Sequence, residues 1–298
     1  MSKILYKKKI LLKKPEWLKI NFPINCDNIQ NIKKILRKNQ LNTVCEEAQC
    51  PNLSECFNSG TATFMILGSV CTRKCPFCAV SKGRAEKVNF KEPKKLAYVI
   101  SKLHLKHVVI TSVTRDDLKD KGIKHFCQCI KEIRKKNNVT IEILVPDFRG
   151  VLKTVLDCFK KNLPNIFNHN IENVPRLYSE VRPGAHYKSS LKLLYNFHKK
   201  FPHIHTKSGL MLGLGERFDE VILVLKDLRK VGVSMITIGQ YLQPSINHLP
   251  VKKYITPSKF KNLEKIALSM GFSSVFSGVF VRSSYHAQLQ KQDMNLII

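Results

Sequence analysis

Six of the ten cysteines in this 298-residue sequence fall between positions 45 and 78, in two groups of three. The N-terminal triplet has the spacing C-x₄-C-x₅-C and consists of Cys45, Cys50 and Cys56. The loop triplet has the spacing C-x₃-C-x₂-C and consists of Cys71, Cys75 and Cys78. Because a few residues of backbone return successive thiolates to one centre, each spacing suits a short loop around a small inorganic core.

Each group contains three cysteines, and this number distinguishes between kinds of metal site. A structural zinc site is closed by four ligands, and an electron-transfer iron–sulfur cluster is normally held by four cysteines. A group of three leaves one iron of a cluster open to a substrate or an unusual ligand. Disulfides are typical of small secreted domains, whereas this chain is neither short nor fronted by a signal peptide. The spacing therefore favours iron–sulfur ligation, with zinc and disulfides as the alternatives.

The loop triplet, with the aromatic Phe77 before its last cysteine, resembles the signature of the radical S-adenosylmethionine superfamily. In that superfamily the amino and carboxylate groups of S-adenosylmethionine chelate the open iron. An electron from the cluster then cleaves the cofactor to a 5′-deoxyadenosyl radical, which takes hydrogen from an unactivated carbon. The cofactor carries the hard chemistry and the protein shields it.

The N-terminal triplet narrows the resemblance to the lipoyl synthase family. The stretch CEEAQCPNLSEC precedes TATFMILG and the loop triplet, and VRSSYHA follows near the end of the sequence at 281–287. Many radical enzymes share the loop triplet, but both triplets together with R-S-S-Y are far more specific. Further matches cover nearly the full length: KKPEWLK (13–19), TSVTRDDLKDKG (111–122), PDFRG (146–150), FNHNIENVPRLY (167–178), VRPGAHY (181–187), GLMLGLGE (209–216) and IGQYLQPS (238–245).

This resemblance implies two 4Fe–4S clusters and S-adenosylmethionine as cofactors. Ser284, the second serine of R-S-S-Y, is then the non-cysteine ligand of the N-terminal triplet's cluster, and Arg282 would offset its alkoxide charge. An alkoxide is more easily displaced from iron than a thiolate, which suits a cluster that must give up sulfur. The implied reaction inserts two sulfur atoms, at carbons 6 and 8 of an octanoyl chain on a carrier-protein lysine, and it consumes that second cluster.

The implied partners are octanoylated lipoyl-carrier domains, namely those of 2-oxoacid dehydrogenase acyltransferases and the glycine cleavage H protein. An electron donor and an iron–sulfur cluster carrier are also expected. A cysteine-rich chain with an oxygen-sensitive cofactor and no export signal indicates a reducing compartment, so we expect a cytoplasmic enzyme. No run of about 18 apolar residues predicts a membrane span.

Polar residues that follow predicted strands are the candidates for cofactor contacts. The resemblance favours S-adenosylmethionine contacts at Asn168, Asn170, Glu172, Gly213, Gly215 and Glu216. Asn168 and Asn170 can donate and accept hydrogen bonds, and the glycines allow close approach of the backbone. A strand-end turn at 168–172 and a helix N-terminal acid at Glu216 are the alternatives. Arg115, Asp116 and Asp117 are either salt-bridged scaffold or substrate-facing groups.

The hydrophobic pattern alternates between strands and helices from residue 61 onward. Strands are predicted at 62–67, 108–112, 140–145, 165–168, 209–212, 235–239 and 274–279, with amphipathic helices between them. Six strand–helix pairs predict a parallel sheet with right-handed crossovers, either open or closed into a barrel. The resemblance makes it an α/β fold, a partial (β/α)₆ TIM-like barrel. We expect an N-terminal extension carrying the second cluster's ligands (1–60), the barrel (61–280) and a short C-terminal tail (281–298).

The net charge of +29 indicates either nucleic-acid binding or a drift toward lysine-rich composition. The charge is spread along the chain without a recurring basic–aromatic pattern, so we expect no dedicated nucleic-acid surface. Cys26, Cys127, Cys129 and Cys158 are expected to be buried thiols rather than ligands. Two competing functions remain open: another radical enzyme with an auxiliary cluster, such as a methylthiotransferase or biotin synthase, and a zinc or nucleic-acid module.

Overall fold

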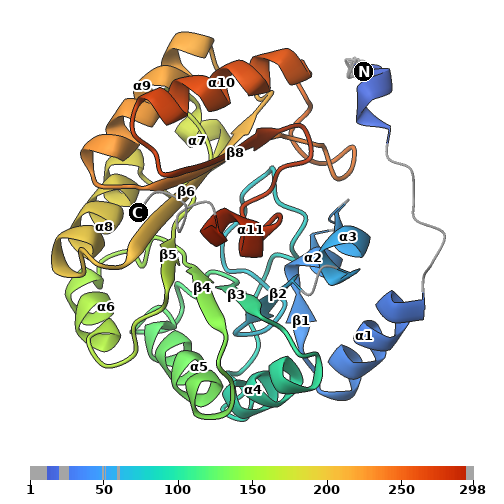
Figure 1. Ribbon diagram of the computed structural model, residues 1–298, viewed down its shortest axis with the longest axis vertical. Coiled ribbons are helices and arrows are strands. Elements are labelled where there is room, and N and C mark those ends of the chain that lie inside the picture. The colour runs from blue at the N-terminus through green and yellow to red at the C-terminus, as the bar shows by residue number, and fades with distance from the viewer. Residues whose placement is uncertain (1–11, 20–26, 49, 51, 59–60, 293–298) are drawn as a thin grey trace, which may run out of the picture.

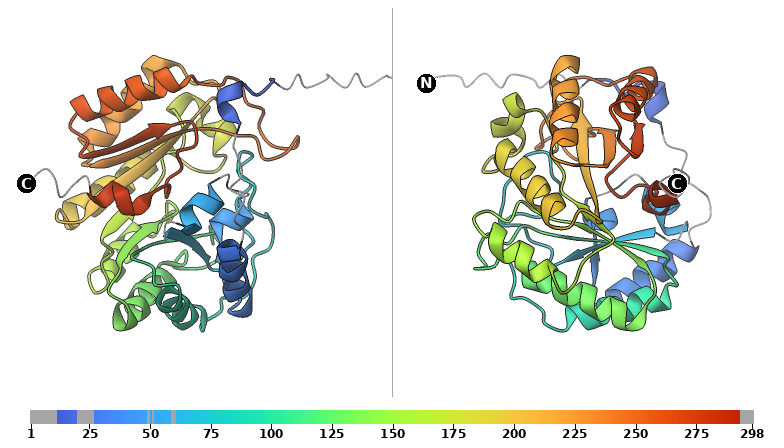
Figure 2. Two further views of the ribbon diagram at one scale, coloured as in Figure 1. Left: turned by 45° about the vertical axis from the view of Figure 1, so that its right-hand side comes forward. Right: turned by 60° about the vertical axis from the view of Figure 1, so that its left-hand side comes forward.

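The computed structural model describes residues 12–19, 27–48, 50, 52–58 and 61–292. Its centre is one curved sheet, and helices cover the outer face of that sheet (Figures 1 and 2). The strands are β1 (Asn42–Thr43), β2 (Thr61–Ile66), β3 (His107–Ser112), β4 (Thr140–Leu144), β5 (Ile166–Asn168), β6 (His205–Leu212), β7 (Met235–Gln240) and β8 (Ser274–Gly278). The longer helices are α1 (Asp27–Lys38), α4 (Glu92–Lys102), α5 (Ile123–Lys136), α6 (Leu152–Phe159), α8 (Tyr187–Lys200), α9 (Phe218–Lys230) and α10 (Pro257–Ser269). Short helical segments are η1 (Glu16–Leu18), α2 (Val44–Glu47), α3 (Leu53–Asn58), η2 (Pro175–Leu177), α7 (Tyr178–Val181) and α11 (Ala287–Gln292).

The strands lie in the sheet in the order in which they occur in the chain, from β1 to β8. Strands β2 to β8 pair in parallel, and β1 pairs antiparallel with β2. Each parallel connection passes through a helix on the outer face, as right-handed crossovers require. The sheet order begins at β1 and finishes at β8, which gives the partial barrel that the resemblance implied.

All seven predicted strands are present as β2 to β8, and their bounds differ from the predictions by a residue or two except at β6, which begins four residues earlier. The six helices predicted between them are present as α4, α5, α6, α8, α9 and α10. Strand β1 and the short helices α2, α3, α7 and α11 were not predicted, because segments of two to six residues carry no readable period. Thr256 occupies the N-cap position of α10, but its side chain makes no capping hydrogen bond.

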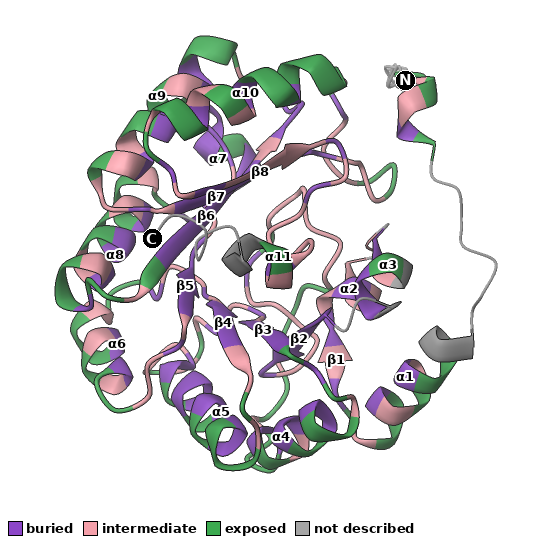
Figure 3. Cartoon of the chain, in the orientation of Figure 1, coloured by how far each residue is buried: buried purple, intermediate pink, exposed green. Residues whose placement is uncertain are grey.

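Burial on both faces of the strands creates the core. Every residue of β2 and of β7 is buried, whereas each long helix exposes its outer stripe to solvent (Figure 3). Stacked and edge-on rings of Phe159, Phe167 and Phe197 join α6, β5 and α8, with centroids 3.7 to 5.8 Å apart. Such pairs add stability beyond the area that they bury. This packing positions the carboxyl end of β5, which is followed by the residues predicted to contact the cofactor.

After β8 the chain turns back across the sheet, and α11 lies in the opening between β8 and the β1–β2 pair (Figure 1). The Asn52 side chain donates to the carbonyl of Phe280 (2.6 Å), and the Thr61 hydroxyl donates to Gln288. A Cβ atom at Gly239 would lie 2.0 Å from the carbonyl oxygen of Val281, so glycine in β7 is what lets the tail cross there. Among the described residues, none of the helices has the length and apolarity that crossing a membrane would require.

Candidate active site

The loop triplet follows β2, at the carboxyl end of the parallel strands. The Cys71 amide donates to Ser81 O (2.8 Å), and the Cys78 amide donates to Cys75 O (3.2 Å), so the loop closes on itself. The Arg73 amide donates to the Cys71 sulfur at 3.4 Å. Burial, together with the nearby charges of Cys75 and Cys71, raises the pKa of the Cys78 thiol to about 11. The three thiols therefore lie close enough to repel one another as thiolates.

Arg73, inside the loop triplet, fixes this loop to the ends of the next two strands. Its guanidinium donates to both carboxylate oxygens of Asp116 (2.7 and 3.0 Å) and to both of Asp147 (2.9 and 2.6 Å). Asp116 follows β3 and Asp147 follows β4. The Thr72 amide also donates to Thr114 O at 3.1 Å. Asp116 is therefore part of a salt-bridged scaffold, one of the two roles considered for it from the sequence.

Arg115 and Asp117 also pair with each other, with Nη2 and Oδ2 separated by 2.8 Å. Arg115 is buried and donates a second hydrogen bond, from Nη1 to the carbonyl of Leu67 (3.1 Å). The hydrogen bond from Arg115 lowers the pKa of Asp117. These contacts give the segment after β3 a structural role beside the loop triplet.

Asn170 and Glu172 lie beside the loop triplet, on the segment that follows β5. Burial raises the pKa of Cys75, while the charges of Arg182 and Arg73 lower it and that of Glu172 raises it. Arg182 is buried and donates to the Asn170 carbonyl at 3.0 Å. The Asn170 amide donates to Glu172 Oε1 at 3.1 Å. Burial also raises the pKa of Glu172. The arrangement offers an amide, a carboxyl group and a guanidinium near one cysteine.

The other predicted cofactor contacts have protein partners in the structure. Asn168 is fully buried and donates to Glu142 Oε1 (3.0 Å), inside the barrel. A Cβ at Gly213 would lie 2.2 Å from the Gln240 amide nitrogen, and one at Gly215 would lie 2.9 Å from Lys252 Cδ. The carboxylate of Glu216 accepts from the amides of Gly213 (2.6 Å) and Leu214 (3.0 Å). These four residues shape the loop after β6 and the barrel interior, whereas Glu172, to which Asn170 donates, is near enough for its charge to raise the pKa of Cys75 and Cys78.

The N-terminal triplet is built on α2 and α3. Thr43 caps α2, and its hydroxyl accepts from the Glu46 amide at 3.4 Å. The Cys50 amide donates to Cys45 O, and the Cys56 amide donates to Asn52 O, each at 3.0 Å. Burial, together with the charge of the Cys50 thiolate, raises the pKa of Cys45 and of Cys56 to about 12. The three thiols thus face one another in a low-dielectric site.

Ser284 lies on the same side of the sheet as this triplet. The Thr63 hydroxyl of β2 donates to Ser284 Oγ at 2.7 Å. The backbone amide of Thr63 also lowers the pKa of Cys45 by hydrogen bonding to its thiolate. One residue of β2 therefore contacts both Cys45 and Ser284, although these two are far apart in the sequence.

Glu55, next to Cys56, anchors the tail that carries Ser284. Its carboxylate accepts from the Tyr285 hydroxyl (3.1 Å to each oxygen) and lies 2.8 Å from His286 Nε2. The backbone of His286 hydrogen-bonds to the Cys56 thiolate and lowers its pKa. The N-terminal triplet and the R-S-S-Y tail thus form one site.

The donor set fits iron–sulfur ligation. The nine described cysteines are free thiols, and Cys26 lies outside the described residues. Within those same residues, no three His, Cys, Asp or Glu side chains converge on a position for a single metal ion. The ligands of a cubane each bind a different iron, so convergence on one point is not expected of either triplet. Burial raises the pKa of five of these thiols, so iron binding must displace their protons: Cys45, Cys50, Cys56, Cys75 and Cys78.

Sequence reasoning did not identify four residues that build these two sites: Arg73, Arg182, Thr63 and Glu55. Arg73 and Glu55 lie within the cysteine motifs, but the motifs alone do not say which side chain points inward. Thr63 is one of six buried residues in β2, and Arg182 lies in a loop that is distant in sequence. Only the three-dimensional arrangement gives them their partners.

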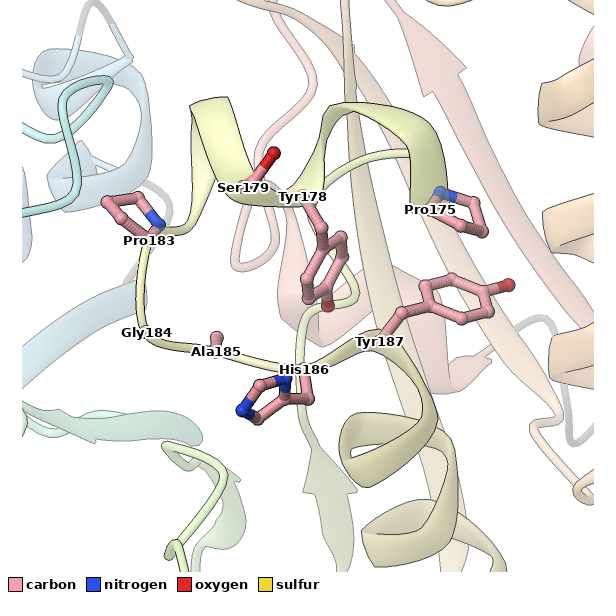
Figure 4. Close-up of a pocket in the computed structure, with 8 residues that line it drawn as sticks. All are labelled: Pro175, Tyr178, Ser179, Pro183, Gly184, Ala185, His186 and Tyr187. Carbon is pink, nitrogen blue, oxygen red and sulfur yellow. The ribbon is translucent and has the colours of Figure 1, made fainter.

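A pocket lies in the segment between β5 and α8 (Figure 4). It is lined by eight residues between Pro175 and Tyr187, and the rings of Tyr178 and Tyr187 pack edge-on at 5.6 Å. None of the predicted ligands or cofactor contacts lines it, so it is distinct from the two cysteine sites.

Comparison with known proteins agrees with this arrangement. Residues 65–239 match the model of the radical SAM superfamily, and residues 2–50 match the N-terminal domain of lipoyl synthase. The lipoyl synthase of Buchnera aphidicola subsp. Cinara cedri is 68% identical over 95% of this chain and 92% of its own length. The chain belongs to the lipoyl synthase family. The lipoyl synthase of Vibrio cholerae is 57% identical over 97% of this chain and 90% of its own length.

Solved structures show the same fold at low sequence identity. Methylornithine synthase is similar with a TM-score of 0.56, 14% identity and coverage of 72% of this chain and 63% of its own. A maturase of the FeFe-hydrogenase has a TM-score of 0.56, 14% identity and coverage of 84% and 62%. The predicted lipoyl synthase family, its radical SAM chemistry and the partial barrel are thereby confirmed.

Proposed function

We propose that this chain uses S-adenosylmethionine to insert two sulfur atoms, at carbons 6 and 8 of an octanoyl chain on a carrier-protein lysine. The observation that carries the proposal is the meeting of the N-terminal triplet with Ser284 through Thr63. A radical enzyme with a single cluster has no need of a second buried group of three thiols. A fourth, oxygen ligand at that group suits a cluster that supplies sulfur.

At the first centre, the loop triplet would hold a 4Fe–4S cluster. When bound, that cluster supplies the electron that cleaves S-adenosylmethionine to a 5′-deoxyadenosyl radical. Asn170 and Glu172 would contact the cofactor, with Arg182 balancing the negative charge around Cys75. Asn168, Gly213, Gly215 and Glu216 would shape the surrounding mouth, since each packs against protein. Arg73 would keep the cysteine loop over the strand ends.

At the second centre, Cys45, Cys50, Cys56 and Ser284 would hold the cluster whose sulfide is the sulfur substrate. Arg282 is near Cys50, and its positive charge lowers the pKa of the Cys50 thiol. Thr63 would donate to Ser284 Oγ and so stabilise the alkoxide form. The first centre lies at the carboxyl ends of the parallel strands, where barrel enzymes place their chemistry, and the tail that carries Ser284 reaches that edge through Ser283 and Asn170. This would hold the acyl chain between the two centres and keep water away from the radical.

We further propose octanoylated lipoyl domains of 2-oxoacid dehydrogenase acyltransferases and the glycine cleavage H protein as substrates. An electron donor and an iron–sulfur cluster carrier would act with the enzyme in the cytoplasm. The chain would divide into a ligand-bearing extension (1–60), the barrel (61–280) and the tail (281–298). The +29 net charge would speed encounter with acidic carrier domains.

The test combines metal content with product analysis. Anaerobically reconstituted chain should hold about eight iron and about eight sulfide, and Ser284→Ala should hold a labile second cluster. Cys158→Ala, on the outer helix α6, is the matched control and should retain the wild-type content. With an octanoyl-lysine peptide and S-adenosylmethionine, the wild type should give a product with two added sulfurs. Formation of 5′-deoxyadenosine without a sulfur-bearing product, or zinc without sulfide, would contradict the proposal.

A further inference from the structure

The two adjacent serines of R-S-S-Y contact different sites. Ser284 receives a hydrogen bond from Thr63, on the side of the N-terminal triplet. Ser283 instead contacts Asn170, on the segment after β5 that borders the loop triplet. The tail therefore touches both cysteine sites through consecutive residues, and only one of these serines is used in the proposed sulfur transfer.

The contact between Ser283 and Asn170 involves both ends of the side-chain amide. The Ser283 hydroxyl donates to Asn170 Oδ1 at 2.9 Å and accepts from Asn170 Nδ2 at 2.7 Å. Asn170 Nδ2 also lies 3.1 Å from Glu172 Oε1, to which it donates. The bond to Glu172 defines which way the amide faces, because a flipped amide would set its oxygen against the carboxylate. The Ser283 hydroxyl, which contacts both ends of the amide, holds it in place.

The surroundings of Asn170 leave this orientation little freedom. A Cβ atom at Gly209 in β6 would lie 2.7 Å from Asn170 Oδ1, so the amide packs directly on the β6 backbone. On the other side, Arg182 holds the Asn170 carbonyl at 3.0 Å. Glu172 has a backbone φ of +68° and pairs with β6 through its own amide and carbonyl. Ser283 is thus the one contact to the Asn170 side chain that comes from the C-terminal tail among the residues described.

We propose that Ser283 is a positioning residue for the S-adenosylmethionine centre: it holds the Asn170 amide in the orientation that binds the cofactor. The inference rests on the proposed function, in which Asn170 contacts S-adenosylmethionine. Its consequence is a division of labour within the motif. Ser284 completes the sulfur-donating centre, and Ser283 completes the centre that generates the radical. A tail that is correctly seated on the N-terminal triplet is then also required for full affinity at the first centre.

The test compares Ser283→Ala, Ser283→Thr and Asn170→Ala in the reconstituted full chain. The measurement is the equilibrium affinity for S-adenosylmethionine under anaerobic conditions, with iron and sulfide content measured on the same samples. Ser283→Ala should bind the cofactor about three- to tenfold more weakly, as expected for one lost hydrogen bond near a charged group. Its iron and sulfide content should match the wild type. Ser283→Thr keeps the hydroxyl and should recover most of the affinity.

Ser269→Ala is the matched control, because Ser269 on α10 bonds only to its own helix, at Ile266 O (2.8 Å). A second readout uses the metal-free chain. There Ser283→Ala should speed hydrogen exchange at the tail amides near residue 285, and Ser269→Ala should not. This readout depends neither on cluster loading nor on turnover.

Two outcomes would refute the inference in distinguishable ways. If Asn170→Ala weakens cofactor binding but Ser283→Ala does not, the proposed site stands and the positioning role is wrong. If neither variant changes the affinity, the assignment of Asn170 to the cofactor fails as well. Loss of iron in Ser283→Ala, without recovery in Ser283→Thr, would show that Ser283 serves the tail as a whole.

Discussion

Replacement of Arg73 by alanine should destabilise the metal-free chain, because one guanidinium neutralises two carboxylates at the barrel mouth. The Arg73 side chain is 8% exposed and that of Asp147 is 4% exposed. Burial raises the pKa of Asp147, but the hydrogen bonds and charge of Arg73 outweigh this and lower it. Removing one partner of a buried pair costs about 3–5 kcal/mol. Asp116 is 30% exposed, so the loss of its bonds adds less.

Urea unfolding of the reduced, metal-free chain measures this cost. Arg217→Ala is the matched control: Arg217 also pairs through two hydrogen bonds, with Asp219, but both side chains are more than 60% exposed. That variant should lose less than about 1 kcal/mol. A double-mutant cycle of Arg73→Ala with Asp147→Asn should give a coupling energy above about 1.5 kcal/mol. An Arg73→Ala loss no larger than that of Arg217→Ala, or additive effects in the cycle, would refute the reasoning.

Three further expectations concern stability. Gly213→Ala should lose about 2–4 kcal/mol of unfolding free energy, because Gly213 has a φ of +104° and an added Cβ would clash with Gln240. Gly150→Ala is the control: Gly150 has a φ of +81° but open space around it, so this variant should lose only about 1–2 kcal/mol. Equal losses in the two variants would contradict the clash. Lys207→Met should cost about 3–5 kcal/mol, because it removes the ammonium partner of the buried Glu142 carboxylate. The double variant Glu142→Gln/Lys207→Met should recover most of this cost in the same assay, and no recovery would contradict the pairing. Burial raises the pKa of Glu142, but Lys207 and His107 outweigh this and lower it to about 2. The stabilisation by this pair is therefore present above pH 4.5 and is lost as the pH falls toward 2. As the pH is lowered from 6 to 2, the urea midpoint should fall more steeply for the wild type than for the double variant, and parallel curves would contradict this.

The fold was predictable because its signals are periodic and repeated. Buried strands such as β2 and β7 are short segments rich in apolar and β-branched residues, and α4 and α9 have a single apolar stripe. Each strand–helix pair repeats the same pattern, so one error would not alter the class. Strand β1 was missed because two residues form it only against β2. The path of the tail across Gly239 depends on the absence of a Cβ atom there, which sequence alone does not reveal.

The site was predictable only as far as its motifs extend. Spacing and family resemblance identified the cysteines and Ser284, and the structure brings the N-terminal triplet and the R-S-S-Y tail together. The sequence was least informative about which residues contact the cofactor. Asn168 and Asn170 are two residues apart at the end of one strand, yet one faces Glu142 in the barrel interior and the other faces the tail. Alternation along a strand would put both on one face, so their different surroundings come from the segment after β5, where Asn170 has already left the strand.

The contacts between α3 and the R-S-S-Y tail determine when the second centre can form during synthesis of the chain. Glu55 and Tyr285 are 230 residues apart, and Asn52 and Phe280 are 228 apart. During synthesis, the early helices α2 and α3 therefore wait for their partner until nearly the whole chain has been made. The backbone of the loop triplet is in place earlier, because its partners reach only to His248 and Leu249, which contact the carbonyls of Cys78 and Pro76. Any metal delivered to the early cysteines before that moment meets an incomplete set of ligands, so the second centre can be finished only after translation.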